Sequence, residues 1–329
     1  PDGSQGRFRF SGGLAWYPDD SDALQDLIHY ADFAMYKVKQ NTKGSLSPFD
    51  RRVYSEDAFL VNAREGLNRM IDEQLVHYAY QPIICARTGE VRGYELLMRP
   101  DVPELRNPNS VLRLAKAQGQ LHHIERMTWF RALESARQMQ REGRLMPGTK
   151  LFINSIANQV LSDEEEAYIV EHYGDLLSQV VLEVTESEDN NMDYTRRKLS
   201  FIRSHHGEVA LDDFGTGYNS ELALVIIRSD YVKLDVSFVR GVDSDSDKQA
   251  LVRNLISYAR KRDIAVLAEG VESRTEMVTL IAFGVDYIQG YYVGRPEHLP
   301  QDVDNIVRRE IRALHQPTED TDTPDVPEI

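Results

Sequence analysis

The sequence predicts an α/β fold, a (β/α)₈ barrel, from the alternation of strands with helices and from the number of strands. Short apolar runs end in polar residues and are followed by helical stretches, and the runs lie at 78–84, 91–97, 151–153, 180–184, 209–211, 231–234, 264–268 and 287–288. Strands that alternate with helices form a largely parallel sheet. Eight strands in about 250 residues is the size of a closed barrel, and a doubly wound open sheet is the structural alternative.

The composition is that of a globular protein that can bury a full core. The chain has 329 residues, of which 41% are hydrophobic and 28% are charged, and Cys85 is its single cysteine. One cysteine cannot form an internal disulfide, which favours a reducing compartment. The sequence has no apolar run of about 18 residues, so we expect no membrane contact from this stretch. Its net charge of −15 argues against binding to duplex nucleic acid.

The ends of the chain differ from the predicted barrel. Residues 7–17 are β-rich, and 21–39 have the apolar spacing of a helix, but fifty residues cannot hold a core of their own. Residues 41–49 are expected to connect or close this first unit, and a helix follows it. The last residues, 316–329, are acidic and contain several prolines, so we predict a disordered tail. Because the sequence begins with Pro1, we expect a piece of a longer cytoplasmic protein, which can carry a membrane anchor upstream.

Polar side chains follow the predicted strands at the points where the strands end: Glu95, Asn154, Glu183, Asp212, Asp213, Lys233, Asp235, Glu269 and Gln289. The carboxyl ends of parallel strands meet at one face of a barrel, where catalytic groups gather. Carboxylates that converge there repel one another and need a cation between them. Carboxylate and amide oxygens favour Mg²⁺ or Mn²⁺, since the His and Cys ligands typical of zinc are missing from the set.

The roles of three of these positions stay open at this point. Neighbours on a strand face opposite sides, so Asp212 and Asp213 share a two-metal site only if the strand ends there; otherwise Asp213 supports the site or caps the next loop. Lys233 and Asp235 share a face, and they either steady phosphoryl charge or form a structural ion pair. Glu269 either binds metal or accepts a proton from water.

Eight motifs in this order resemble the EAL-domain phosphodiesterases, which cleave the bacterial second messenger cyclic di-GMP. They are YQPI (80–83), ELLMR (95–99), NS (154–155), LEVTE (182–186), DDFGTGY (212–218), KLD (233–235), EGVE (269–272) and QGYYVGRP (289–296). The opening residues, with WYP (16–18), AMY (34–36) and FD (49–50), are similar to the C-terminal end of a GGDEF domain. These resemblances predict a GGDEF fragment at 1–50, a linker at 51–57, an EAL domain at 58–315 and the tail at 316–329.

The resemblance implies a modified TIM-like barrel with one antiparallel strand. It also implies hydrolysis of cyclic di-GMP to linear pGpG with two Mg²⁺ or Mn²⁺ ions, by a homodimer. The implied catalytic residues are Lys233, Glu269 and Glu95; the implied metal ligands are Glu95, Asn154, Glu183, Asp212 and Asp213; the implied substrate contacts are Gln81, Leu97, Arg99, Asp235, Glu272, Gln289 and Pro296; and Glu186 is implied to support the loop after Asp213.

The sequence departs from the family pattern beside the substrate. Leu96 stands where alanine is usual, Pro100 stands in place of tryptophan, and the loop at 101–109 lacks the usual His-Pro pattern. These changes leave the metal ligands intact but alter the rim of the site. They motivate one alternative, a non-catalytic receptor for cyclic di-GMP. Without the resemblance, the lysine and the acidic groups would also fit an enolase-type proton abstraction.

Overall fold

The computed structural model describes residues 10–41, 45–105, 107–185, 192–214, 224 and 226–315. The chain divides into two compact units, one within residues 1–69 and 102–105 and the other within 70–101 and 106–329. The predicted tail at 316–329 lies outside the described residues. In the described part, no helix is both long enough and apolar enough to cross a membrane.

The first unit is a small strand and helix assembly. Its elements are β1 (Gly12–Leu14), α1 (Leu24–Asn41), β2 (Leu46–Pro48), most of α2 (Arg51–Asp72) and a 3₁₀ turn (Pro103–Leu105). Strands β1 and β2 pair in parallel, so part of the segment expected only to connect or close the unit is a strand. The rings of Tyr30 and Phe49 stack with centroids 4.2 Å apart, and Tyr54 packs edge-on against Tyr30. Aromatic packing therefore contributes much of this unit's apolar contact.

The predicted linker at 51–57 is helical. Helix α2 runs without a break from Arg51 to Asp72, and Asp50 Oδ1 accepts hydrogen bonds from the backbone N–H groups of Arg52 and Val53 at its start. Residues 51–65 contain no proline or glycine, so nothing local interrupts the helix before Gly66. Domain limits at residues 50 and 58 stay predictions.

The second unit is a closed barrel. Its strands are β3 (Val76–Cys85), β4 (Val91–Pro100), β5 (Lys150–Asn154), β6 (Val180–Thr185), β7 (Glu208–Phe214), β8 (Tyr231–Leu234), β9 (Ala265–Ala268) and β10 (Tyr287–Ile288). They pair in the order β10, β3, β4, β5, β6, β7, β8, β9. Strand β3 is antiparallel to both neighbours, and the other pairs are parallel. Each predicted run overlaps one of these strands, with residue 264 preceding β9, and closure excludes the open sheet.

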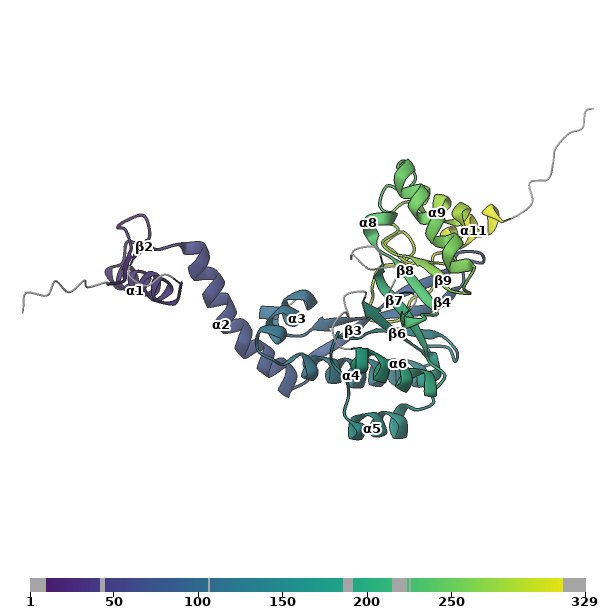
Figure 1. Cartoon of the computed structure of the whole chain (residues 1–329), viewed down its shortest axis with the longest axis horizontal. Helices are drawn as coiled ribbons and strands as arrows, with labels where there is room; N and C mark the ends of the chain where they lie inside the picture. The colour runs from purple at the N-terminus through teal and green to yellow at the C-terminus, as the bar shows by residue number, and fades with distance from the viewer. Residues whose placement is uncertain are drawn as a thin grey trace, which may run out of the picture. The chain divides into compact units, whose positions relative to one another are not determined.

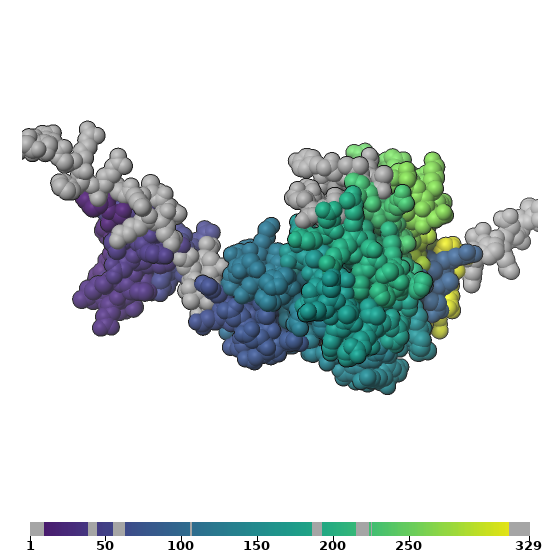
Figure 2. Space-filling model, turned by 60° about the horizontal axis from the view of Figure 1, so that its bottom comes forward, coloured from purple at the N-terminus to yellow at the C-terminus, as the bar shows by residue number. Residues whose placement is uncertain are grey.

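Helices surround the barrel and cover its apolar strands. They are α3 (Pro108–Ala117), α4 (Leu121–Arg141), α5 (Asp163–Tyr173), α6 (Met192–Ser204), α8 (Val236–Val239), α9 (Ser246–Arg260), α10 (Arg274–Phe283) and α11 (Asn305–Leu314), with a 3₁₀ turn at Leu177–Gln179. Helix α4 packs on β3 and β5, α6 on β7 and α9 on β9 (Figure 1). In Figure 2 the teal and green residues form much of the visible surface of this unit. Buried side chains from β3, β5, β6, β7 and β9 form one apolar cluster, which contains Ile83, Phe152, Val181, Ala210 and Leu267.

The amino-terminal end of the barrel is closed by polar contacts. Lys150 Nζ lies 2.9 Å from Glu208 Oε1, and the Tyr231 hydroxyl donates to Glu208 Oε2 at 2.8 Å. Arg92 Nη2 donates to the same hydroxyl at 3.3 Å. We call these four residues the basal cluster. Lys150 and Glu208 form an ion pair and the Tyr231 hydroxyl is hydrogen-bonded, whereas Arg92 Nε is buried without a hydrogen-bond partner among the described residues.

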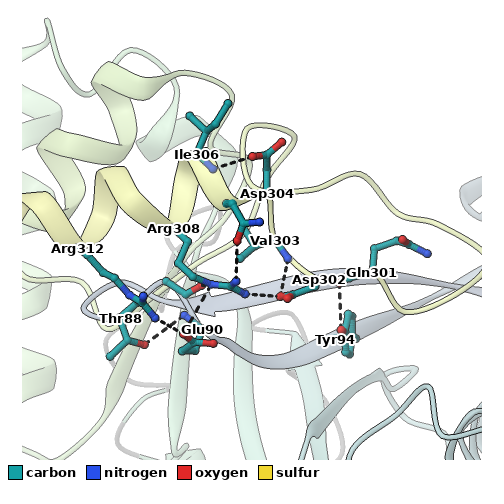
Figure 3. A network of polar contacts seen from close by, with 12 residues as sticks. Thr88, Glu90, Tyr94, Gln301, Asp302, Val303, Asp304, Ile306, Arg308 and Arg312 are labelled. Carbon is teal, nitrogen blue, oxygen red and sulfur yellow. Dashed lines mark hydrogen bonds and ion pairs between the residues drawn. The ribbon is translucent and has the colours of Figure 1, made fainter.

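Helix α11 is held against the turn between β3 and β4. Figure 3 shows Arg308 and Arg312 reaching from the helix toward Glu90 and Thr88 of that turn. Arg308 also forms an ion pair with Asp302, which precedes the helix. These contacts fix the last described helix to the closed end of the hairpin.

Candidate active site

The predicted site residues lie at the carboxyl ends of the parallel strands, on β4, and on β3, the antiparallel neighbour of β4. Glu95 lies on β4, Asn154 ends β5, Glu183 lies on β6, Asp212 lies on β7, Lys233 lies on β8 and Glu269 follows β9. Asn154 and Glu183 are paired in register across β5 and β6, and Gln81 of β3 lies opposite Glu95. Residues from six successive strands thus reach one mouth of the barrel, as the strand-end pattern predicts.

Lys233 forms the centre of the site. Its Nζ lies 2.6 Å from Glu183 Oε1, 2.7 Å from Glu269 Oε1, 3.0 Å from Asp212 Oδ1 and 3.7 Å from Glu95 Oε1. The side chain is 1% exposed. The cation that convergence of carboxylates requires is therefore supplied in part by the protein itself, through the ammonium group of Lys233.

The electrostatics of the site follow from burial and from these contacts. Burial disfavours the charged form of Lys233, but the surrounding carboxylates, Asp212 first among them, outweigh it and raise the pKa of Lys233 well above its usual value. Burial and the neighbouring Glu95 raise the pKa of Glu183 well above normal. Burial, together with Asp212 and Glu95, raises the pKa of Glu269 to about 8 against the opposing effect of Lys233. The site holds more carboxylates than its single lysine can compensate.

Two amide side chains orient Glu95. Asn154 Nδ2 donates to Glu95 Oε1 at 3.0 Å, and Gln289 Nε2 donates to Glu95 Oε2 at 2.6 Å. Gln289 Nε2 also lies 3.1 Å from Gln81 Oε1. Burial raises the pKa of Glu95. The charge of Lys233 and the two amide donors lower it by a larger amount, so the net pKa is below normal. Glu95 is therefore held ionised in a fixed orientation.

The donor set has the chemistry of a divalent metal site, although its acidic groups turn toward Lys233. Glu95, Glu183, Asp212 and Glu269 surround one ammonium, which leaves an excess of negative charge. Glu183 Oε2 is buried and accepts no hydrogen bond from a described residue. Among the described residues, no three His, Cys, Asp or Glu side chains are arranged around a common metal position. The charge excess and the unused oxygen fit an oxygen-liganded divalent cation.

The tandem aspartates differ in their surroundings. Asp212 is buried against Lys233, whereas Asp213 is exposed and has a left-handed backbone with φ of 54°. The pairing of β7 with β8 is irregular between Leu211 and Phe214. The left-handed residue and the irregular pairing together mark a bulge at Asp213, after which Phe214 pairs again with Leu234. Partial desolvation by the surrounding protein and the neighbouring Asp212 raise the pKa of Asp213.

The spacing of Lys233 and Asp235 predicted a hydrogen bond that is not formed. Asp235 Oδ1 instead accepts a hydrogen bond from Ser237 N at 2.9 Å and caps α8. Because β8 ends at Leu234, Asp235 already lies outside the alternation that would have placed it beside Lys233. The Lys233 ammonium therefore interacts with the four carboxylates and not with Asp235.

The other predicted substrate contacts lie around the mouth. Leu97 and Arg99 are half-buried on β4, and Arg99 Nη1 donates to Met98 O at 3.0 Å. Glu272 forms an ion pair with Arg240. Pro296 is half-buried beside a bridge between Tyr80 and Glu297. Glu186, predicted to support the loop after Asp213, lies outside the described residues.

A buried ionic group beside Asn154 was missed by sequence reasoning. Glu125 of α4 and Lys198 of α6 converge on Ser155, the residue that follows Asn154. Both positions lie among buried apolar side chains of their helices, such as Ile124 and Ile202. A charged residue on the apolar face of a helix is the sequence signal that could have identified them.

Comparison with known proteins identifies related domains. The family model described as the EAL domain matches residues 64–296. The cyclic di-GMP phosphodiesterase NbdA of Pseudomonas aeruginosa is 28% identical over 289 residues, which cover 86% of this chain and 37% of NbdA. The probable cyclic di-GMP phosphodiesterase PdeG of Escherichia coli is 32% identical over 239 residues, which cover 70% of this chain and 46% of PdeG. The chain thus spans less than half the length of either relative.

The fold also matches solved structures. A standalone EAL protein from Vibrio cholerae O395, in its c-di-GMP-bound form, is 27% identical with a TM-score of 0.60, and the match covers 70% of this chain and 95% of that protein. The match supports the modified barrel found here, in which one strand runs antiparallel to its neighbours.

Proposed function

The chain belongs to the EAL-domain family, and on this premise we propose that it hydrolyses one phosphodiester bond of cyclic di-GMP to give linear pGpG. The observation that carries the proposal is the buried cluster of four carboxylates around Lys233 at the carboxyl end of the barrel. Polar groups of this kind in a barrel mouth are characteristic of catalytic sites.

The proposed cofactors are two Mg²⁺ or Mn²⁺ ions. The residues proposed to hold them are Glu95, Asn154, Glu183 and Asp212 for the first ion, with Asp213 at the second. The excess negative charge and the unused Glu183 Oε2 support this assignment. When bound, such ions stabilise charge on phosphoryl oxygens and help to activate the attacking water.

Lys233 and Glu269 are proposed to handle the attacking water. The ammonium of Lys233 has protons to donate, and it is held in place by carboxylates on several sides. Glu269 is partly exposed, and its raised pKa of about 8 lies near neutral pH, the range in which one group can both accept and release a proton. The 2.7 Å contact between the two groups keeps the donor and the acceptor together.

Substrate binding requires local positive charge, since the substrate is dianionic and the chain has a net charge of −15. Arg99 and Lys233 supply fixed positive charges in the region of the mouth, and the proposed ions would add to them. Gln81, Leu97 and Pro296 line the β3–β4 side of the same mouth in the proposed complex. The altered residues after Arg99 affect this rim. They leave unchanged the acidic cluster, by which we mean Glu95, Glu183, Asp212 and Glu269 around Lys233.

The proposal is tested by incubating the protein with cyclic di-GMP and Mn²⁺ and by measuring pGpG chromatographically. We expect turnover that is lost with a chelator and lost almost completely in Glu95→Ala and Asp212→Ala. Asp302→Ala, which alters an acidic residue paired with Arg308 outside the cluster, is the matched control. Tight binding of cyclic di-GMP without any turnover in Mn²⁺ would contradict the enzyme and identify a receptor.

Two wider predictions also belong to this proposal. The family resemblance predicts a homodimer and a GGDEF fragment before the barrel. Sedimentation at assay concentrations tests the first, because a fully active monomer would contradict it. The cytoplasmic location stays a prediction from the sequence.

A further inference from the structure

We propose that Glu125 and Lys198 are positioning residues that hold Asn154 in place and thereby set the affinity of the site for its divalent cation. This inference rests on the proposed function, since it assigns Asn154 to the metal site. Neither residue contacts the cluster around Lys233. Both act on the backbone and the side chain that directly follow Asn154.

Glu125 binds the end of β5 with both carboxylate oxygens. Ser155 Oγ donates to Glu125 Oε1 at 2.9 Å, and Ile156 N donates to Glu125 Oε2 at 2.7 Å. Trp129 Nε1, one turn further along α4, donates to Oε1 at 3.1 Å. The side chain of Glu125 is only 1% exposed. A buried carboxylate with several donors holds those donors in one geometry.

Lys198 holds the same segment from the opposite helix. Its Nζ donates to Ser155 Oγ at 2.6 Å and to Ile156 O at 2.5 Å, and lies 3.8 Å from Glu125 Oε1. The ammonium is 5% exposed. Breaking such a pair leaves an uncompensated buried charge, so α4 and α6 are joined firmly across the residues after Asn154.

Asn154 itself has little packing to fix it. It ends β5 with an exposed side chain, whereas the four preceding residues of the strand are buried. Its amide donates to Glu95 Oε1, and the next residue's N–H donates to Glu183 O at 3.0 Å. The orientation of Asn154 toward Glu95 and Glu183 therefore depends on the backbone that Glu125 and Lys198 anchor.

We expect replacement of Glu125 or Lys198 to lower the Mn²⁺ affinity of the folded protein and not only its stability. We call these two residues the anchor. Groups that orient metal ligands typically change metal affinity by about 10- to 100-fold when they are altered. A purely structural ion pair would change stability and leave the metal affinity of the folded protein unchanged. The two roles are separable by experiment.

The test compares Glu125→Gln and Lys198→Met with Lys150→Met. Glu125→Gln keeps the volume but turns an amide NH₂ toward groups that are themselves donors. Like Asn154, Lys150 lies on β5. It forms an ion pair with Glu208 of β7 at the other end of the barrel. Mn²⁺ binding to each folded protein is measured by calorimetry without substrate, together with thermal unfolding, kcat and KM.

We expect Glu125→Gln and Lys198→Met to bind Mn²⁺ about 10- to 100-fold more weakly, with turnover restored in part by high Mn²⁺. Lys150→Met should lower the unfolding temperature and keep the parental Mn²⁺ affinity. If both anchor variants bind Mn²⁺ as tightly as the parent, the inference is overturned. The proposed function still stands in that case if the parent turns over cyclic di-GMP. A parent that binds Mn²⁺ without turnover would contradict the function, and the Mn²⁺ affinities would still decide the inference. A parent that binds no Mn²⁺ would overturn both.

Discussion

The two ends of the barrel both contain buried ionic groups, but their charges are balanced differently. At the amino-terminal end, Lys150 and Arg92 share one carboxylate, Glu208, through an ion pair and through the Tyr231 hydroxyl. At the carboxyl end, the single ammonium of Lys233 faces four carboxylates. The basal cluster thus has two cations beside one carboxylate, whereas the cluster around Lys233 has one cation beside four carboxylates.

This difference separates a structural group from a functional one. Burying a charge costs free energy unless partners compensate it, so a fold that only needed stability would not keep an excess of carboxylates. Such an excess is explained when the groups bind something of opposite charge. The four predictions below test this distinction, beginning with the largest expected effect.

Replacing Lys233 should have the largest effect. Lys233→Met removes the ammonium group that the four carboxylates share, so we expect turnover to fall about 10²- to 10³-fold or more. The loss of the buried partner should also lower the free energy of unfolding by about 3–5 kcal/mol in metal-free buffer. Cyclic di-GMP turnover and urea unfolding measure the two effects. Parental turnover in this variant would refute the role given to Lys233.

Replacing Lys150 should affect stability alone. Lys150→Met leaves Glu208 with the Tyr231 hydroxyl as a donor, so we expect a loss of about 1–3 kcal/mol in the free energy of unfolding. Turnover per folded molecule should match the parent, because the basal cluster lies at the opposite end from the acidic cluster. Urea titration and steady-state kinetics check both values. A large fall in kcat would show that the two ends are coupled.

Glu276 provides a compensated carboxylate for comparison with Glu183. Its burial raises its pKa. The backbone N–H donors of Gly241, Glu272 and Ser273 lower that pKa by a larger amount, so the net pKa is below normal. A lowered pKa in the folded state stabilises the protein above about pH 4.5, and this contribution is lost as the pH falls through the folded pKa.

Glu276→Gln should therefore lower the free energy of unfolding at pH 7 by about 1–2 kcal/mol. The difference from the parent should shrink as the pH falls below about 4.5. Urea unfolding at several pH values measures it, with the exposed Glu171→Gln as control. An equal difference at every pH would mean that the charge of Glu276 has no part in the effect.

The contacts of α11 should give the smallest changes. The Arg308 side chain is 16% exposed and pairs with Asp302 and Glu90, whereas Arg312 is 54% exposed and pairs with Glu90 (Figure 3). We expect about 1 kcal/mol of destabilisation for Arg308→Ala and less than about 0.5 kcal/mol for Arg312→Ala. Thermal unfolding at two salt concentrations compares them. The reverse order would contradict the weight given to burial.

Much of the barrel could be predicted from local patterns. Each of the eight apolar runs became a strand because runs of apolar residues between helices have few other ways to be buried. The prediction was weakest before the barrel. The linker expected at 51–57 is part of a helix, and β2 lies in a segment rich in turn residues. The helix reflects the lack of local helix breakers, whereas β2 depends on a partner distant in the sequence, β1.

The sequence by itself determined which chemical groups reach the mouth, because a residue that ends a parallel strand must lie at the carboxyl face of the sheet. Only the tertiary structure decided how those groups divide their contacts. Lys233 pairs with carboxylates from four other strands or strand ends instead of with Asp235, two residues away. Glu125 and Lys198 meet at Ser155 from two different helices. Contacts between residues distant in sequence follow from closure of the barrel, which local spacing does not encode.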